Sequence, residues 1–398
     1  QNNGNKLVSD NFDFAKRQMV HMLENIPQGE AKMPHSINGK GNTSCRSIYW
    51  WTSGFFPGIL WYINEYTGDK TFESFAKKWT EKLEPVKTFK GNHDIGFMMY
   101  FSFGNAYRLT QNEKYKDILI QSAYSLATRF NPQVGTIKSW DSWRSWENKH
   151  VFKYPVIIDN MMNLELLFWA SKATGDPSFR NIAISHAEKT MKYQIRKDGS
   201  SYHLACYDPE TGNFIKGETS QGYSNESTWS RGQGWGIYGF TLCYRETKDP
   251  RFLKTAQRMA DYYINHPNLP SDKIPWWDFD THRPGFIPGK FSKTNKYIQN
   301  YRDASAASVT ASALLELSSY VKDDKKKIYT ETALQILTSL SSPEYRAEEG
   351  KNGNFILKHS TGAIPHGSEV DVPLIYADYY FLEALLRYNR MINNKPIL

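Results

Sequence analysis

The feature that most constrains the fold of this chain is a helix–turn–helix unit that recurs five times. Each copy has an apolar helix, a short polar turn, an aromatic residue a few positions on, and a second helix. The copies lie at 61–79, 105–123, 168–187, 242–260 and, more loosely, 317–337. A repeat of this kind cannot bury its apolar face alone, so successive copies must pack against one another.

The turns of the repeat contain residues that stop one helix and start the next. Gly68-Asp69 and Gly175-Asp176 combine a residue suited to a left-handed stop with an aspartate N-cap, and Lys248-Asp249 occupies the same place. We expect one further helix near 11–24 and a last one near 375–391. The total is then twelve helices.

Connections of two lengths alternate along the chain. Short turns lie within the hairpins, and long segments precede most first helices, at 26–53, 130–158, 196–230, 266–302 and 342–373. Long loops with little structure of their own are usually functional. This alternation predicts an all-α fold, an (α/α)6 barrel that forms a single domain over residues 1–398, with an α-solenoid as the alternative. Strand-like alternation is confined to loop stretches such as 202–207.

The first helix of each hairpin is rich in small and apolar residues and should belong to the inner ring. All inner helices then begin at one rim, where the long loops gather. The residues expected there are Trp51, His93, Asp94, Asp159, Asn160, Trp229, Arg231, Gln233, Asp303 and Asp371. Free N–H groups and helix dipoles at such a rim favour an anionic ligand, and we predict that His93, Asn160 and Gln233 contact it.

Asp94 and Asp159 stand at the heads of two helices that are otherwise almost wholly apolar. Aspartate is a common N-cap, so capping alone would explain either one. Two carboxylates on one rim, beside His93 and Asn160, also match the acid–base equipment that acts on sugars. We therefore predict that both aspartates are catalytic.

The stretch WSRGQGWGIYGF at 229–240 is the second candidate. Its glycines do not follow a strand, so a dinucleotide site is a poor interpretation. Arg231 can clamp a carboxylate with paired hydrogen bonds, and Trp229 and Trp235 can face a sugar ring. Trp51 and Trp140, in tryptophan-rich segments before inner helices, are predicted as further aromatic walls, with a packed loop core as the alternative.

The amino-acid composition limits the classes of ligand that the chain is expected to bind. The net charge of +8 comes from scattered Lys and Arg without a nucleic-acid patch, and suits steering of a small anionic substrate. Aromatic residues make up 15% of the chain, which favours carbohydrate binding. No apolar run reaches the ~20 residues that span a membrane. The three cysteines are widely spaced and no histidine pair has metal-ligand spacing, so we expect no metal site.

Several motifs together resemble the unsaturated glucuronyl hydrolases, glycoside hydrolase family 88. They are WTSGFFPGILW at 51–61, HDIGF at 93–97, PVIIDNMMNLELL at 155–167, WSRGQGWGIYGF at 229–240 and DYYFLEALLR at 378–387. Their order spans almost the whole chain. The resemblance implies the same (α/α)6 barrel and the release of a 4,5-unsaturated uronic acid from the non-reducing end of lyase-generated oligosaccharides.

Matched residue by residue, the resemblance implies that Asp159 is the main acid/base and that Asp94 assists it beside His93. Arg231, Trp229 and Trp235 would hold the sugar and its carboxylate. His203 and Gln221 match ring-contacting positions in a loop that lacks a sharp motif. Such chemistry hydrates a C4=C5 double bond and requires neither metal nor cofactor, and no protein partner is evident.

Two other functions stay open on the sequence alone: an inverting glycosidase acting on saturated sugars, and a glycan-binding protein without turnover. The parent polysaccharide also stays open, with glycosaminoglycan fragments (chondroitin, hyaluronan or heparin) favoured over xanthan or gellan fragments. Because the sequence starts at Gln1 rather than Met, we expect a removed leader and a periplasmic or secreted location, with the cytoplasm as the alternative.

Overall fold

The hairpins close into a ring in the computed structural model, which describes residues 2–398. The inner helices contact one another in the cyclic order α2, η2, α6, α8, α10, α12 and back to α2. Their bounds are α2 (Phe55–Thr67), η2 (Gly96–Gly104) continuing as α4 (Asn105–Thr110), η3 (Ile158–Asn163) continuing as α6 (Leu164–Thr174), α8 (Ser230–Thr247), α10 (Ala304–Ser318) and α12 (Ile375–Ile392). The predicted (α/α)6 barrel is confirmed.

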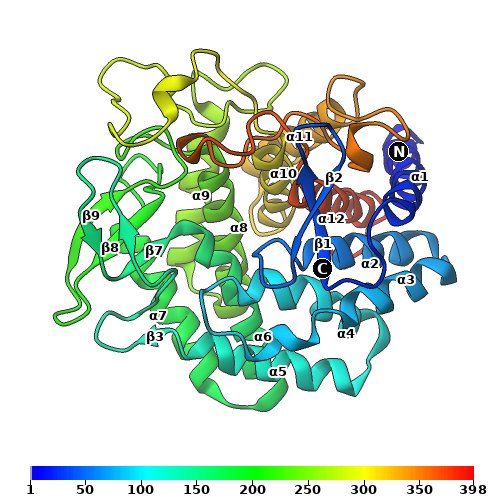
Figure 1. The fold of residues 1–398 in the computed structure, drawn as a ribbon, viewed down its shortest axis with the longest axis horizontal. Coiled ribbons are helices and arrows are strands. Elements are labelled where there is room, and N and C mark those ends of the chain that lie inside the picture. Colours follow the sequence, from blue (N-terminus) through cyan, green and yellow to red (C-terminus); the bar gives the residue numbers. More distant parts are fainter. Residues whose placement is uncertain (1) are drawn as a thin grey trace.

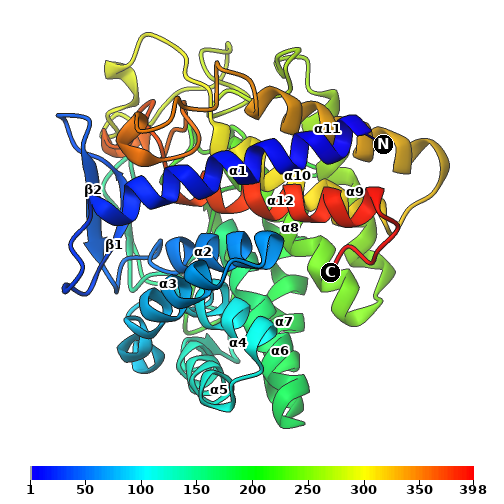
Figure 2. The same cartoon turned by 90° about the vertical axis from the view of Figure 1, so that its right-hand side faces the viewer.

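The second ring of helices packs outside the first. It consists of α1 (Asn2–Glu24), α3 (Lys70–Glu81), α5 (Glu113–Ala127), α7 (Pro177–Tyr193), α9 (Pro250–Asn265) and α11 (Asp323–Leu340). Figure 2 shows α1 running alongside α12, so the first and last helices form the sixth hairpin. The predicted start of the first helix near residue 11 is wrong. Residues 2–10 continue the same helix, with Val8 fully buried against the core.

The short turns behave as the sequence predicts. Gly68, Gly175 and Lys248 adopt left-handed conformations at helix C-termini. The side chains of Asp69, Asn112, Asp176 and Asp249 each accept a hydrogen bond from the backbone N–H two residues on. These local signals start and stop helices without help from the rest of the fold.

The long loops contain short strands and helical turns, and Figure 1 shows the β7–β9 strands to one side of the helices. The strands are β1 (Lys32–Ile37), β2 (Thr43–Ser47), β3 (Phe130–Asn131), β4 (Thr136–Ile137), β5 (Trp143–Arg144), β6 (Val151–Phe152), β7 (Pro155–Ile157), β8 (Leu204–Tyr207) and β9 (Phe214–Glu218). The short turns are η1 (Glu84–Thr88), η4 (Thr294–Lys296), η5 (Asn352–Asn354) and η6 (Ile364–His366). Antiparallel sheet β7-β8-β9 joins two of the long loops.

Two inner helices start irregularly. η2 is a π-helix that follows Asp94, and η3 is a 3₁₀-helix that contains Asp159. π-helical turns are rare and frequently mark functional sites. The irregular starts therefore set the two aspartate-bearing segments apart from the other inner helices.

Asp378 connects α12 to the loop before it. Its buried carboxylate accepts hydrogen bonds from the backbone N–H groups of Ile356 (2.8 Å) and Leu357 (2.9 Å). Burial raises the pKa of Asp378 to about 8. The folded state therefore holds this proton more tightly than the unfolded chain, where Asp titrates near ~4. Its contribution to stability is complete below that pH and is lost as pH rises toward 8.

Asp378→Asn should make this stability less dependent on pH. At pH 5 the variant loses one hydrogen bond and should be about 1 kcal/mol less stable than the parent. At pH 8 the parent also bears the cost of a buried charge, so the difference should vanish or reverse. Urea midpoints of both proteins at the two pH values measure this. If the two proteins differed by the same amount at pH 5 and pH 8, the raised pKa of Asp378 would be contradicted.

Candidate active site

Asp94 and Asp159 do not cap helices. The N-cap residue of η2 is Ile95 and that of η3 is Ile157, and neither makes a side-chain cap hydrogen bond. Asp159 lies in the first turn of η3, 6% exposed, and its buried Oδ1 accepts no hydrogen bond from residues 2–398. Capping therefore does not explain either carboxylate, whereas Asp303 at the start of α10 does cap its helix.

Ser139, in the loop between β4 and β5, fixes the two aspartate segments to each other. Its carbonyl accepts the N–H of His93 at 3.1 Å, and its own N–H donates to the Pro155 carbonyl at 2.9 Å. Its Oγ accepts the N–H of Ile157 at 2.9 Å. One buried serine thus sets the position of His93-Asp94 relative to the strand that leads into Asp159.

Asn160 and Asn163 make a second connection beneath the aspartates. Asn160 donates to the Ile137 carbonyl (3.0 Å) and accepts from the Asn163 amide (3.2 Å), while Asn163 Oδ1 accepts the N–H of Phe97 (3.0 Å). A Cβ at Gly96 would meet Asn163 at 2.5 Å, so this close approach requires glycine. The Asn160 amide thus joins η3 to β4 and, through Asn163, to η2, and contact of Asn160 with a substrate stays a prediction.

His203 is positioned beside Asp159 by the β-sheet. Strand β7 pairs with β8, and the N–H of Ile158 donates to the His203 carbonyl at 2.8 Å. The imidazole Nδ1 accepts the backbone N–H groups of Ser220 (3.0 Å) and Gln221 (3.2 Å). The ring proton is therefore on Nε2, which lies 3.5 Å from Asp159 Oδ1.

Burial lowers the pKa of His203, and the nearby Asp159 carboxylate offsets this only in part. The neutral imidazole therefore presents an N–H to Asp159 at neutral pH. A fixed tautomer of this kind orients a carboxylate without adding a charge.

Two substitutions distinguish the roles of the two ring nitrogens of His203. His203→Asn retains an acceptor near Nδ1 for the loop N–H groups and loses the Nε2–H beside Asp159. We expect it to keep the parent's thermal midpoint and to lose about 10- to 100-fold in kcat. His203→Gln should show the opposite pattern, with a lower midpoint and more residual activity. Equal activity losses in both variants would contradict the separate roles.

His93 is fully buried, and its Nε2 lies 3.0 Å from Asp94 Oδ1 without the alignment of a hydrogen bond. Neither ring nitrogen has an aligned hydrogen-bond partner among residues 2–398. The ring nitrogens of His93, beside Asp94, are therefore available to hydrogen-bond a ligand.

Trp229 contacts two predicted site residues, His203 and Arg231. The centroid of the Trp229 ring lies 4.5 Å from the centroid of the His203 ring. The Arg231 guanidinium carbon also lies 4.5 Å from the Trp229 centroid. The Tyr376 ring is 5.1 Å from the same guanidinium carbon. These contacts connect the start of α8 to the loop of His203 and to the start of α12.

Arg231 is 1% exposed and holds neighbouring loops. It donates to the carbonyls of Thr361 (2.8 Å) and Gly362 (2.9 Å) and pairs with Asp303 at 3.2 Å. Its Nε has no hydrogen-bond partner within residues 2–398. The guanidinium is thus largely engaged by the protein, and Nε is the donor it retains.

The predicted aromatic walls occupy different depths. Trp51 is partly exposed and packs on Phe97 and Tyr376, with ring centroids 5.2 and 4.8 Å away. Trp140 is partly exposed, 6.5 Å from the His203 ring. Trp235 is fully buried between Phe97 and Tyr380. Trp51 and Trp140 are therefore the rings that solvent reaches.

Buried polar atoms without a partner concentrate in this region. Within residues 2–398 they include Asp159 Oδ1, His203 Nε2, Gln221 Oε1, Trp229 Nε1, Arg231 Nε, Trp235 Nε1, Tyr376 Oη and both ring nitrogens of His93. Proteins leave few buried polar groups unpaired, and each needs an explanation. A polar ligand that contacts several of them supplies one.

Gln233, predicted to bind substrate, is fully buried and hydrogen-bonded within the protein. Its Nε2 donates to the carbonyls of Gly199 (2.7 Å) and Met259 (3.0 Å), and its Oε1 accepts from Ser201 Oγ (2.9 Å). This side chain therefore connects α8 to the 199–201 loop and to α9. The helical position was right, but the side chain points to the outer ring.

Tyr376 was missed by the sequence reasoning. The rim position expected for the last inner helix was Asp371, which instead pairs with His359 at 2.7 Å on an exposed loop. Tyr376 is the second residue of α12 and has a fully buried side chain. The sequence could have indicated Tyr376, because it directly follows Ile375, the expected start of the last inner helix.

Among residues 2–398, no three His, Cys, Asp or Glu side chains are grouped so that they could hold a metal ion. No helix in the same range is long and apolar enough to cross a membrane.

The Glycosyl Hydrolase Family 88 model matches residues 25–243. This chain belongs to that family. An unsaturated glucuronyl hydrolase of Formosa agariphila is 45% identical over 343 residues, covering 86% of this chain and 80% of the relative. One of Bacillus sp. strain GL1 is 34% identical over 372 residues, covering 92% and 93%.

The fold agrees with this membership. The crystal structure of an unsaturated glucuronyl hydrolase specific for heparin superimposes with a TM-score of 0.88 at 44% identity, covering 98% of this chain and 99% of that one. The family resemblance drawn from the motifs is confirmed, and the chain is a glycoside hydrolase.

Proposed function

We propose that this enzyme removes a 4,5-unsaturated uronic acid from the non-reducing end of oligosaccharides by hydrating its C4=C5 bond. The observation that carries the proposal is the Asp159 carboxylate. It caps no helix, it is buried, and it faces the Nε2–H of a neutral His203. Family membership at 45% identity to an unsaturated glucuronyl hydrolase supplies the substrate class.

The substrate's own chemistry sets the order of events. The unsaturated uronate is a vinyl ether, because C5 of its double bond is attached to the ring oxygen. Protonation at C4 breaks the π bond and leaves positive charge on C5, shared with the ring oxygen. Water then adds at C5 and loses a proton. The resulting hemiketal opens, and the remaining sugar chain is released from C1.

Asp159 can serve both proton transfers. Protonated, it donates to C4, and as a carboxylate it accepts the proton of the attacking water. The Nε2–H of His203, 3.5 Å away, stabilises the carboxylate between these two events. Because water attacks C5 rather than the anomeric carbon, carboxylate spacing does not define an anomeric outcome here.

Asp94 and His93 form the second polar group, attached to the Asp159 segment through Ser139. We assign them to orienting the ring hydroxyls and the attacking water. Trp51 and Trp140 provide aromatic faces for the sugar, and Gln221 and Trp229 offer it buried polar atoms that have no partner within residues 2–398. The net charge of +8 favours the approach of an anionic substrate.

We further propose that the substrates are glycosaminoglycan fragments. The proteins that resemble this chain include a heparin-specific unsaturated glucuronyl hydrolase and an unsaturated chondroitin disaccharide hydrolase of Streptococcus pyogenes, 33% identical over 347 residues. A periplasmic or secreted location, rather than a cytoplasmic one, stays a prediction that fractionation of the source cells tests.

Ultraviolet absorbance tests the function, because the conjugated enoate absorbs and its hydration abolishes the absorbance. Unsaturated disaccharides from heparin, chondroitin and hyaluronan should each be mixed with the folded enzyme. We expect loss of absorbance with at least one, and the ratio of kcat/KM values then ranks the parent polysaccharides. No loss with any of them, alongside release from saturated substrates, would replace this proposal with an ordinary glycosidase.

A further inference from the structure

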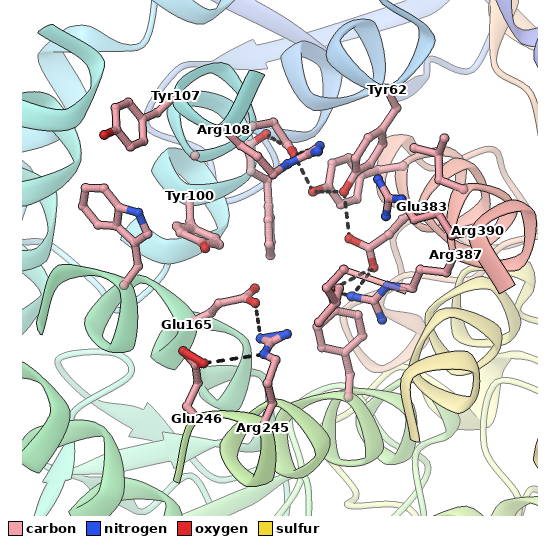
Figure 3. Close-up of a pocket in the computed structure, with 18 of the residues that line it drawn as sticks. Tyr62, Tyr100, Tyr107, Arg108, Glu165, Arg245, Glu246, Glu383, Arg387 and Arg390 are labelled. Carbon is pink, nitrogen blue, oxygen red and sulfur yellow. Dashed lines mark hydrogen bonds and ion pairs between the residues drawn. The ribbon is translucent and has the colours of Figure 1, made fainter. Parts of the chain in front are cut away.

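A separate cavity lies at the end of the barrel opposite the two aspartates. Its volume is about 470 Å³, and its lining comes from inner helices, among them α4, α6 and α12, and reaches their C-terminal ends. Asp94 and Asp159 stand at the N-terminal starts of two inner helices, η2–α4 and η3–α6. A volume of this order is typical of small-molecule pockets. Figure 3 shows Tyr100, Glu165 and Arg245 around the open space.

A layer of aromatic side chains separates the two ends of the barrel. Trp235 contacts Phe97 and Tyr380 at ring-centroid distances of 5.2 and 5.5 Å, and Phe101 contacts the same two rings at 5.7 and 6.0 Å. All four are at most 2% exposed. A ligand in the cavity therefore cannot reach the aspartates, and the cavity is independent of the site described above.

The charges around the cavity are already paired. Lys172 bonds Glu246 at 2.6 Å, and Arg245 pairs with Glu165 and Glu316. Glu65 bridges two further arginines, Arg108 and Arg390, and Arg387 pairs with Glu383 at 3.5 Å. A charged ligand would have to displace one of these partners, so the lining favours a neutral molecule.

Polar groups without partners remain on the walls. In Figure 3 the Tyr100 and Tyr107 hydroxyls make no hydrogen bond to the other residues drawn around the cavity. Arg387 Nε is buried and has no hydrogen-bond partner within residues 2–398. Arginines near helix C-termini compensate helix dipoles, but that role does not explain unpaired phenols. The phenol hydroxyls can both donate and accept and Arg387 Nε can donate, so the hydroxyl groups of a ligand match both.

Aromatic faces complete the lining. Tyr107 and Trp169 meet edge to face with ring centroids 5.9 Å apart, and both side chains are partly exposed at the cavity. Aromatic surfaces beside hydrogen-bonding groups suit a molecule with apolar C–H faces and polar edges.

We propose that this cavity is a second binding site, which takes a neutral polyhydroxylated molecule of mono- or disaccharide size. Its ligand contacts the phenols of Tyr100 and Tyr107 and packs against Trp169. The site involves no bond making or breaking, and its occupancy does not depend on the hydrolase reaction.

Calorimetric titration of the full chain with glucose and with N-acetylglucosamine tests the proposal. The test variant is Tyr100→Phe with Tyr107→Phe, which removes two hydroxyls and keeps both rings. The control variant is Trp140→Ala, at the aspartate end of the barrel. We expect saturable binding of at least one sugar, about tenfold weaker in the double variant and unchanged in the control.

Two results would overturn the proposal. One is no saturable binding of either sugar by the folded enzyme. The other is binding that Trp140→Ala removes and the double phenylalanine variant retains, which would place the sugar at the aspartate end. Equal thermal midpoints for the parent and the double variant exclude misfolding as the cause of weaker binding.

Discussion

Asp159→Asn is expected to lower kcat by about three orders of magnitude and to leave the fold intact. Asparagine has the same shape but can neither donate a proton to C4 nor accept one from water at neutral pH, and general acid–base catalysis is worth roughly 10²–10⁴-fold. Because Asp159 caps no helix and its Oδ1 makes no aligned hydrogen bond to residues 2–398, the substitution costs little packing. Initial rates from enoate absorbance measure the loss.

Asp176→Asn is the matched control. Asp176 caps α7 by accepting the N–H of Ser178 at 2.8 Å, and asparagine caps equally well. The same chemical change at a capping position should therefore alter neither turnover nor thermal midpoint. An Asp159→Asn enzyme that retained a tenth or more of the parental kcat would remove Asp159 from the acid–base role.

Arg231→Ala is expected to cost about 3–5 kcal/mol of stability, because it leaves Asp303 buried without its cationic partner. It also releases the Thr361 and Gly362 carbonyls, which hold the loop before α12. Thermal and urea midpoints measure the change. Turnover should fall as well, since Trp229, which contacts His203, loses the guanidinium that packs on its ring.

A double variant separates charge from packing. Arg231→Met with Asp303→Asn removes both charges and retains a long apolar side chain and an acceptable cap for α10. We expect it to be more stable than Arg231→Ala alone. If the two variants lost equal stability, the buried charge of Asp303 would not be the source of the effect.

The fold was accessible from sequence because its signals are local. Asp69, Asp176 and Asp249 cap helices through neighbouring N–H groups, and Gly68 and Gly175 stop helices with positive φ values of 71° and 77°. A repeat of such turns reports the number of hairpins directly. The error at the start of α1 arose because its first turns are polar, while their burial depends on a distant partner, α12.

The roles of rim residues were harder to predict because side-chain direction is set by distant contacts. Gln233 and Arg231 are two residues apart on α8, yet Gln233 bonds the 199–201 loop and α9, while Arg231 reaches a loop 130 residues further on. His203 had no sharp motif, and its tautomer depends on the backbone of Ser220 and Gln221. Spacing along one helix contains none of this information.

The measurement that tests the central claim most directly is the reaction of an unsaturated disaccharide in D₂O, followed by NMR of the released uronate. If Asp159 protonates C4 of the double bond, one deuterium should appear at C4, on a single face, in step with the loss of absorbance. A released uronate that keeps its C4=C5 bond and contains no deuterium at C4 would contradict hydration and point to direct cleavage at the anomeric carbon.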